Sequence, residues 1–307
     1  MNKIGYRLDD ESIGGSVIGL DRELGSLLAD GINCVELPAH GLGVIRNGEL
    51  DTKALKNLKS ILGLYDFDYT VHCVDSMNLM DTENPQDHLK LFKASMDLCA
   101  LIGAGIFVYH PGRFMPEEEF IFNRKNEMDE KEMEGLVEVE RACIRAEASR
   151  FPDINICMEN ARPYKGVQNY CYAEQMEKLL RQVREISCSN VGITLDTGHL
   201  FLAANHYGFN PAAAVESAKK YIFHVHLHDN FGKACYHHEK KQSHLVPLGK
   251  GDCHMPIGMG TAPVKAIIDT IKNDYTGRYV FEYRSIYRDF LKESAGNLNA
   301  LLNGMMA

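Results

Sequence analysis

Eight short, strand-like apolar runs alternate with amphipathic segments along the whole chain. Between these runs, apolar residues recur about every 3.6 positions, which predicts helices over Leu89 to Ile102, Met133 to Ala148, Tyr172 to Val183 and Val264 to Ile271. Strands that alternate with helices build a parallel sheet, and eight such units predict a single closed (β/α)8 TIM barrel. The expected strands are Ile4 to Leu8, Cys34 to Leu37, Tyr69 to Cys73, Ile106 to Tyr109, Ile154 to Met158, Val191 to Leu195, Ile222 to Leu227 and Tyr279 to Tyr283.

An open, doubly wound sheet would give a similar alternation. Such a sheet usually carries a glycine-rich phosphate loop after its first strand. Here Leu8 is followed by Asp-Asp-Glu-Ser-Ile-Gly-Gly, and the sequence contains neither a G-x-G-x-x-G nor a Walker A motif. No internal repeat or shift of composition divides the chain, so we expect residues 1–307 to form one barrel domain.

Several helix starts carry residues that cap helices or break the preceding segment. Asp21 and Asp51 are expected to precede the first two helices, and Asn84-Pro85 and Asn210-Pro211 two later ones.

Composition narrows the possible partners and the cellular compartment. The net charge of −9 gives no general attraction to a polyanion, so nucleic acid is not expected as a partner. Nine cysteines are dispersed singly, which is typical of reduced thiols, and no leader or membrane-length apolar run is evident. We therefore expect a cytoplasmic protein that acts on a small molecule away from membranes; its oligomeric state is left open.

A spaced series of metal-type side chains accompanies the strands. Most of them directly follow an apolar run, and in a parallel barrel all strand C-termini open on one face. Imidazole and carboxylate groups are natural ligands for zinc, manganese or iron. The series is His72, His110, Glu159, Asp196, His199, His226, Asp252, His254 and Glu282.

Each of these residues alone has a simpler structural explanation. A single histidine is usually a hydrogen-bonded core residue, Asp196 could cap the following helix, and Glu282 could pair with Arg284. Together they are harder to explain as packing, because converging buried carboxylates repel one another unless cations neutralise them. We therefore expect a divalent-metal site at the C-terminal ends of the strands, with zinc first and manganese or iron as alternatives.

Other polar residues are expected to meet the substrate. Alternation along the seventh strand puts His224, His226 and His228 on one face; we favour His226 as the ligand and place His228 nearer the rim. His228, His244 and Arg284 are the expected substrate-binding residues. Two long connections, 112–129 and 229–260, follow strand ends, and the second predicts a wall or lid of the site.

The set of metal-type residues resembles that of the xylose isomerase-like TIM-barrel superfamily, which includes endonuclease IV and many sugar isomerases and epimerases. The superfamily's shared four-ligand core matches Glu159, Asp196, His226 and Glu282. The endonuclease IV branch holds three zinc ions through five further ligands, which match His72, His110, His199, Asp252 and His254. Connection 229–260 also contains His244 in a similar segment, so the choice between His244 and His254 stays open. The length and histidine content of this connection are similar to those of a cobamide-remodelling branch.

The resemblance implies two main functions. The first, which we expect, is hydrolysis of a small phosphodiester or phosphomonoester, such as the nucleotide loop of a cobamide, with two or three ions per chain and Glu159, Glu282 and His199 as catalytic residues. This hypothesis uses all nine ligands. The second is isomerisation or epimerisation of a sugar or sugar phosphate, with one ion on the four-ligand core, proton transfer by Glu159 and Glu282, and substrate binding by His199. An endonuclease IV-like abasic-site endonuclease, or a barrel that binds metal without turnover, are the remaining alternatives.

Overall fold

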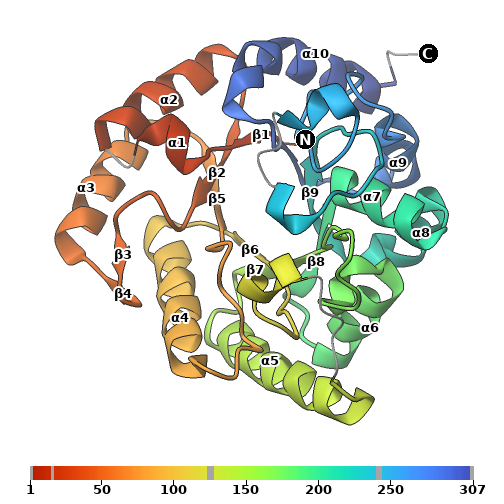
Figure 1. Ribbon diagram of the computed structural model, residues 1–307. Helices are drawn as coiled ribbons and strands as arrows, with labels where there is room; N and C mark the ends of the chain where they lie inside the picture. The colour runs from red at the N-terminus through yellow and green to blue at the C-terminus, as the bar shows by residue number, and fades with distance from the viewer. Residues whose placement is uncertain (1–2, 15–16, 123–127, 240–243, 305–307) are drawn as a thin grey trace.

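Eight parallel strands close into a barrel, as the alternation predicted (Figure 1). The computed structural model describes residues 3–14, 17–122, 128–239 and 244–304. Around the barrel each strand pairs with the next in chain order, and the last pairs with the first. The barrel strands are β1 (Lys3–Arg7), β2 (Cys34–Pro38), β5 (Asp68–His72), β6 (Ile106–Tyr109), β7 (Asn155–Glu159), β8 (Val191–Asp196), β9 (Ile222–Leu227) and β10 (Arg278–Phe281).

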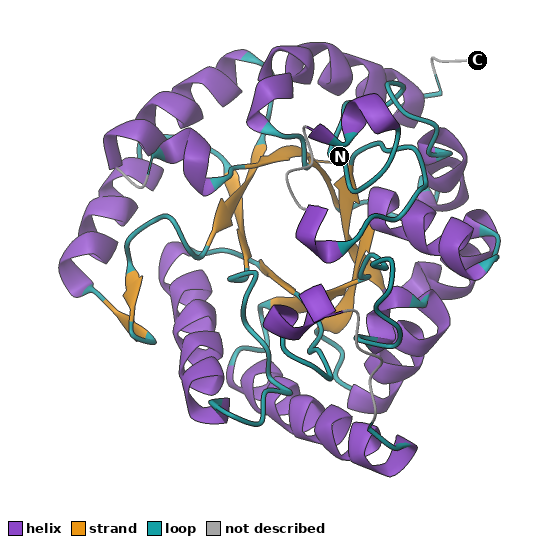
Figure 2. Ribbon diagram, viewed as in Figure 1, coloured by secondary structure: helices purple, strands orange, loops and turns teal. Residues whose placement is uncertain are grey.

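A ring of helices surrounds the strands, and Figure 2 shows this layer outside the barrel. The helices are α1 (Asp10–Ile13), α2 (Val17–Ala29), α3 (Thr52–Leu62), α4 (Pro85–Ile102), α5 (Glu130–Arg150), α6 (Met176–Ile186), α7 (Thr197–Tyr207), α8 (Pro211–Ala218), α9 (Val264–Ile271) and α10 (Leu291–Leu302). A small antiparallel pair, β3 (Ile45–Arg46) and β4 (Glu49–Leu50), lies outside the barrel sheet. Short 3-10 turns are η1 (Glu117–Phe122), η2 (Tyr172–Glu174), η3 (Lys219–Tyr221), η4 (His237–Glu239), η6 (Val246–Leu248) and η7 (Ser285–Phe290).

The helix starts confirm most of the expected caps. The Asp51 carboxylate accepts hydrogen bonds from Lys53 N at 3.0 Å and Ala54 N at 2.9 Å, and Asn210 caps α8 ahead of Pro211. The expectation for Asp21 was wrong, because α2 begins four residues earlier and the Asp21 side chain instead accepts from Tyr65.

The helix expected from Tyr172 begins only at Met176. The Cys171 thiol and the Glu174 side chain form a capping box that closes η2 as a separate turn, and Gln175 is extended. The apolar periodicity that predicted one helix therefore spans two elements, η2 and α6, because the extended Gln175 separates them.

The inside of the barrel contains polar side chains where many barrels pack only aliphatic ones. Glu36, Thr70, Thr194 and His224 have no solvent exposure, whereas the apolar core lies largely between the strands and the helix ring. A carboxylate and an imidazole in such a place need partners, because an unpaired buried charge is costly. Glu36 and His224 must therefore have polar partners inside the barrel.

No helix among the described residues is long and apolar enough to cross a membrane.

Candidate metal centre

Four strand ends deliver an inner group of ligand-type residues to one point. Glu159, Asp196 and His226 end or lie within β7, β8 and β9, and Glu282 directly follows β10. One ligand atom from each lies within 4.8 Å of every other, and all four residues are buried. The Nδ1 atom of His226 lies 3.5 Å from Glu159 Oε1 and 3.5 Å from Glu282 Oε2. We call these four residues the inner group.

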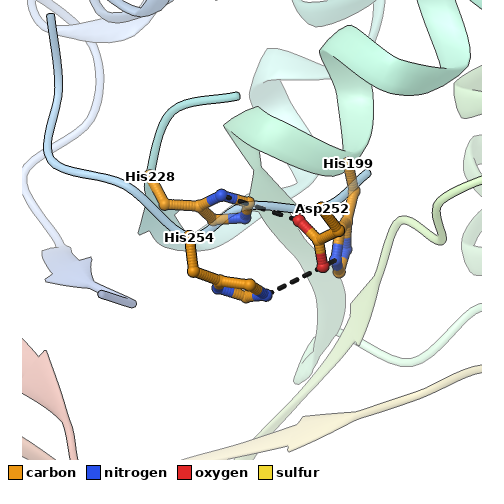
Figure 3. A group of neighbouring side chains, drawn as sticks. All are labelled: His199, His228, Asp252 and His254. Atoms are coloured by element: carbon orange, nitrogen blue, oxygen red, sulfur yellow. Dashed lines mark hydrogen bonds and ion pairs between the residues drawn. The ribbon is translucent and has the colours of Figure 1, made fainter. Parts of the chain in front are cut away.

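A second cluster, the outer group, consists of His199, His228, Asp252 and His254 (Figure 3). The Asp252 carboxylate lies between the rings: its Oδ2 is 2.8 Å from His254 Nε2 and 3.3 Å from His199 Nε2, and its Oδ1 is 3.8 Å from His228 Nδ1. His228 is fully buried here rather than at the rim. The structure places His254 in this group, whereas His244 is exposed on the long connection.

Glu159 connects the inner group to two further histidines. His72 Nε2 and His110 Nε2 lie 3.5 Å and 3.2 Å from Glu159 Oε2, and His199 Nδ1 lies 3.4 Å from Glu159 Oε1. The structure thus brings all nine residues of the predicted ligand series into one continuous network. Their roles as ligands stay a prediction.

Backbone carbonyls orient three of these imidazoles. His72 Nδ1 lies 3.0 Å from Cys73 O, His199 Nδ1 lies 3.0 Å from Asn160 O, and His254 Nδ1 lies 2.8 Å from Glu282 O. A carbonyl oxygen only accepts, so we assign the proton of each neutral ring to Nδ1. Burial lowers the pKa of His72 and His199, but hydrogen bonds to Glu159 and Asp252 help to raise it well above its ordinary value; a bound cation would displace the proton on Nε2 and use that nitrogen, as proteins orient metal-binding histidines.

The donor atoms of the site fit a cation. Buried atoms that make no hydrogen bond of normal geometry include both Glu159 oxygens, His226 Nδ1, Glu282 Oε2, His72 Nε2 and Asp252 Oδ1. Burial raises the pKa of the Glu159 carboxyl, but the facing His226 and His110 outweigh burial and hold that pKa well below its ordinary value. A divalent ion that displaced the imidazole protons would find ionised carboxylates and imidazole nitrogens, which are suitable ligands.

His254 has a backbone conformation that is unusual for a residue other than glycine. Its φ is +46°, in the left-handed region. Its ring contacts the Glu282 carbonyl, and its own carbonyl accepts a hydrogen bond from Arg284 N at 3.1 Å. Strain of this kind is kept where surrounding contacts fix a side chain in a required direction.

Glu36 is a site residue that the sequence reasoning missed. It lies within β2 and is fully buried; its Oε2 is 2.8 Å from His224 Nε2 and its Oε1 is 2.9 Å from His226 Nε2. Burial raises the pKa of Glu36, but the two histidines hold it well below its ordinary value. The contact with this carboxylate favours the proton of His226 on Nε2, although the pair lacks normal hydrogen-bond geometry, and leaves the Nδ1 lone pair toward the inner group.

Asp229 fixes the long connection that carries Asp252 and His254. Its buried carboxylate accepts hydrogen bonds from four backbone N–H groups at 2.8 to 3.0 Å, those of Asn230, Gly258, Gly260 and Ala262. The backbones of Asp229 and Met255 also form a two-way antiparallel bridge. The connection is therefore attached to the end of β9 close to Asp252 and His254.

Gly198 leaves room for His228. A Cβ atom at position 198 would lie 2.0 Å from His228 Cε1, and the ring cannot withdraw easily because its Nε2 lies 3.0 Å from the Asp196 carboxylate. The glycine in Asp196-Thr197-Gly198-His199 thus permits close approach between α7 and the outer group.

A cavity of about 370 Å³ opens onto both groups, within the size range of small-molecule sites. Glu159 and Glu282 line it, whereas Asp196 and His226 lie behind them. Arg284 also lines this cavity, together with Arg7, Arg113 and Arg162; the last three were missed because nothing in their local sequence marks them. His244 is not among the lining residues.

The chain belongs to the xylose isomerase-like TIM barrel family, whose profile matches residues 26–301. It is 28% identical over 252 residues to an uncharacterized protein of Methanocaldococcus jannaschii, a match that covers 79% of this chain and 73% of that protein.

Solved structures share the barrel over nearly its full length. A D-tagatose 3-epimerase-like protein has a TM-score of 0.71 at 20% identity, covering 99% of this chain and 100% of that one. The 3-keto-D-glucoside 4-epimerase of E. coli has a TM-score of 0.66 at 15% identity, covering 98% and 100%. The IOLI protein, solved with a bound zinc atom, has a TM-score of 0.66 at 17% identity, covering 98% and 97%. At these identities the similarity demonstrates the fold.

These comparisons correct the expectation of phosphoester hydrolysis. Several similar structures with a named activity are sugar epimerases, an L-ribulose 3-epimerase among them, and these comparisons give no support to hydrolysis, to an abasic-site endonuclease or to cobamide remodelling. The hydrolytic hypothesis relied on counting nine ligands. A set of convergent donors does not by itself specify the reaction that takes place beside it.

Proposed function

We propose that this protein is a divalent-metal-dependent epimerase or isomerase of a ketose or related sugar. The observation that carries the proposal is the asymmetry of the inner group. Glu159 and Glu282 face the cavity, while Asp196 and His226 are completely buried behind them. Two ligands are thus hidden from substrate, and two carboxylates can reach it.

Glu159, Asp196, His226 and Glu282 would hold one ion, with zinc first and manganese or iron as alternatives. When bound, such an ion polarises the carbonyl and neighbouring hydroxyl of a sugar, which acidifies the adjacent C–H bond. The outer group has donors for a second ion. The isomerase chemistry needs only the inner one, so the number of ions per chain is part of the proposal.

The two cavity-facing carboxylates would perform the proton transfers. One carboxylate oxygen takes the proton from the carbon beside the carbonyl, and the other carboxyl returns a proton to the opposite face of that carbon. The sugar is neither oxidised nor reduced, and its configuration at this carbon is inverted. His199 also lines the cavity and would bind a substrate hydroxyl.

Solvent exchange tests this proposal directly. Metal-loaded protein, incubated with a panel of ketoses in D2O, should place deuterium on the carbon next to the carbonyl and form the epimer. Glu159→Gln and Glu282→Gln should each slow exchange by about 100-fold or more, which is typical for loss of a general acid or base. Exposed Glu177→Gln is the matched control and should exchange at the original rate. Absence of both exchange and epimer across the panel, in protein shown to contain metal, would refute the proposal.

A further inference from the structure

Four arginines line the cavity, and protein groups already occupy three of them. Arg7 Nη1 lies 3.1 Å from Glu282 Oε1, and Arg162 Nη1 lies 2.8 Å from Asp252 Oδ2. The Arg113 guanidinium donates to the backbone oxygens of Asp75 and Ser76, each at 3.1 Å. Each of these three charges therefore has acceptors within the protein.

Arg284 is different. In the part of the chain that the structure describes, no ion pair or hydrogen bond joins its guanidinium to an acceptor, and its Nε is buried without a partner, as are those of Arg7 and Arg113. Its backbone is fixed, because Arg284 N donates to His254 O and Arg284 O accepts from Tyr287 N at 2.8 Å. The residue thus offers an uncompensated guanidinium from a rigid position on the cavity wall.

Arg284 lies close in the chain to the inner group and is hydrogen-bonded to the outer group. It follows Glu282 by two residues, and its N–H binds the backbone of His254 in the outer group. Arg162 donates a hydrogen bond to Asp252, two residues before His254. A sugar whose reacting carbons lie against the inner group would therefore extend its far end toward Arg284 and Arg162.

The unpaired charge indicates which chemistry the far end of the substrate carries. A guanidinium on a cavity wall is best compensated by an oxyanion, which it can bind through two parallel N–H donors. A neutral hydroxyl would leave the charge uncompensated. The site should therefore favour an anionic sugar over a neutral one.

We propose that Arg284, with Arg162 in the lining of the same cavity, binds an oxyanion at the end of the substrate remote from the reacting carbon, a phosphate monoester or a carboxylate. The protein would then act on a phosphorylated or acidic ketose in preference to the neutral sugar. This inference rests on the proposed function, whose reaction it makes specific.

The test compares D-fructose, D-fructose 6-phosphate and D-fructuronate in the D2O exchange assay with metal-loaded protein. One of the two anionic sugars should have the highest kcat/KM, and which one it is distinguishes phosphate from carboxylate. Arg284→Met, which keeps the length and loses the charge, should lower the ratio of kcat/KM for the anionic over the neutral sugar by about tenfold to a hundredfold. Arg22→Met, at an exposed arginine outside the cavity, is the matched control and should leave this ratio unchanged. A preference for the neutral sugar, or an equal ratio in Arg284→Met, would overturn the inference while the epimerase proposal stands.

A binding measurement keeps the inference testable if no ketose is turned over. The dissociation constant of D-fructose 6-phosphate and of D-fructuronate is measured by NMR line broadening, with wild type and Arg284→Met at equal metal content. A tenfold or greater weakening in the variant for either anion supports the oxyanion site even if the epimerase proposal fails. If wild type and Arg284→Met bind each of the two anions with the same affinity, the oxyanion site is overturned.

Discussion

Replacing Glu36 by glutamine should weaken metal binding without removing any ligand. Glu36 presents one oxygen to His224 Nε2 and the other to His226 Nε2, at 2.8 and 2.9 Å. Glutamine has the same shape but one acceptor and one donor end. One of the two imidazoles must therefore face an NH2 group.

The result follows from the tautomer of His226. If its Nε2 accepts from the new amide, its proton moves to Nδ1, the atom that lies 3.5 Å from both Glu159 and Glu282. A protonated Nδ1 cannot coordinate a metal. Loss of such a supporting carboxylate typically lowers metal affinity about tenfold to a hundredfold, or about 1.4 to 2.7 kcal/mol.

The assay is competition for zinc between the protein and a chromophoric chelator of known affinity, which needs no substrate. Glu174→Gln is the matched control, since Glu174 is an equally buried carboxylate that contacts Tyr207 rather than a ligand-type histidine. It should bind zinc as the wild type does. A Glu36→Gln affinity within twofold of wild type would show that Glu36 does not set the tautomer of His226, and the argument would fail.

Three further outcomes are expected. Gly198→Ala should displace His228 and destabilise the fold by about 1 to 3 kcal/mol in urea unfolding, and Gly296→Ala, where an added Cβ meets nothing within 4 Å, is the comparison that should show no such loss. Asp229→Ala should cost about 3 kcal/mol or more, because four backbone N–H groups lose their acceptor, and hydrogen exchange should locate the loosening in residues 255–262; unchanged protection there would contradict this role. Burial raises the pKa of Glu174 from 4.5 to about 7, so the folded state binds the proton more tightly and the penalty for ionisation grows as pH rises from about 4.5 to 7. Glu174→Gln should therefore gain about 3 kcal/mol of unfolding free energy over wild type at pH 8 compared with pH 4, and equal pH profiles for the two proteins would refute this.

The barrel could be predicted from sequence because strand and helix periods are local properties. The ranges expected for β6 and β9 are those observed, and the others differ by a few residues at their ends. β10 ends at Phe281, earlier than expected, where the chain turns to present Glu282 to the inner group. Most of the ligand-type residues could be recognised because they follow apolar runs, whereas His199, Asp252 and His254 were matched through the family resemblance.

The remaining site residues do not follow an apolar run, so the pattern that marked most of the ligand-type residues does not mark them. Glu36 stands within the apolar stretch Cys34-Val35-Glu36-Leu37, and a lone acid there was a usable signal, since a buried carboxylate is rare without a partner. Arg162 has no such signal, because its partners Asp252 and His199 come from distant parts of the chain. The reaction was misjudged for a related reason: ligand types report the metal chemistry, whereas the loops that shape the cavity select the substrate.

The attachment of residues 255–262 to Asp229 also bears on how such proteins diverge. The connection leaves the barrel at Asp229 and is fastened back to the same residue at Met255, just after Asp252 and His254. Residues between these two points form a closed excursion whose ends do not depend on its length, and the entropic cost of lengthening a loop grows only slowly. The described residues between 230 and 251 do not line the cavity, so insertions and deletions there would leave Asp252 and His254 in their places. A single aspartate would in this way allow related barrels to vary this connection without disturbing the candidate metal centre.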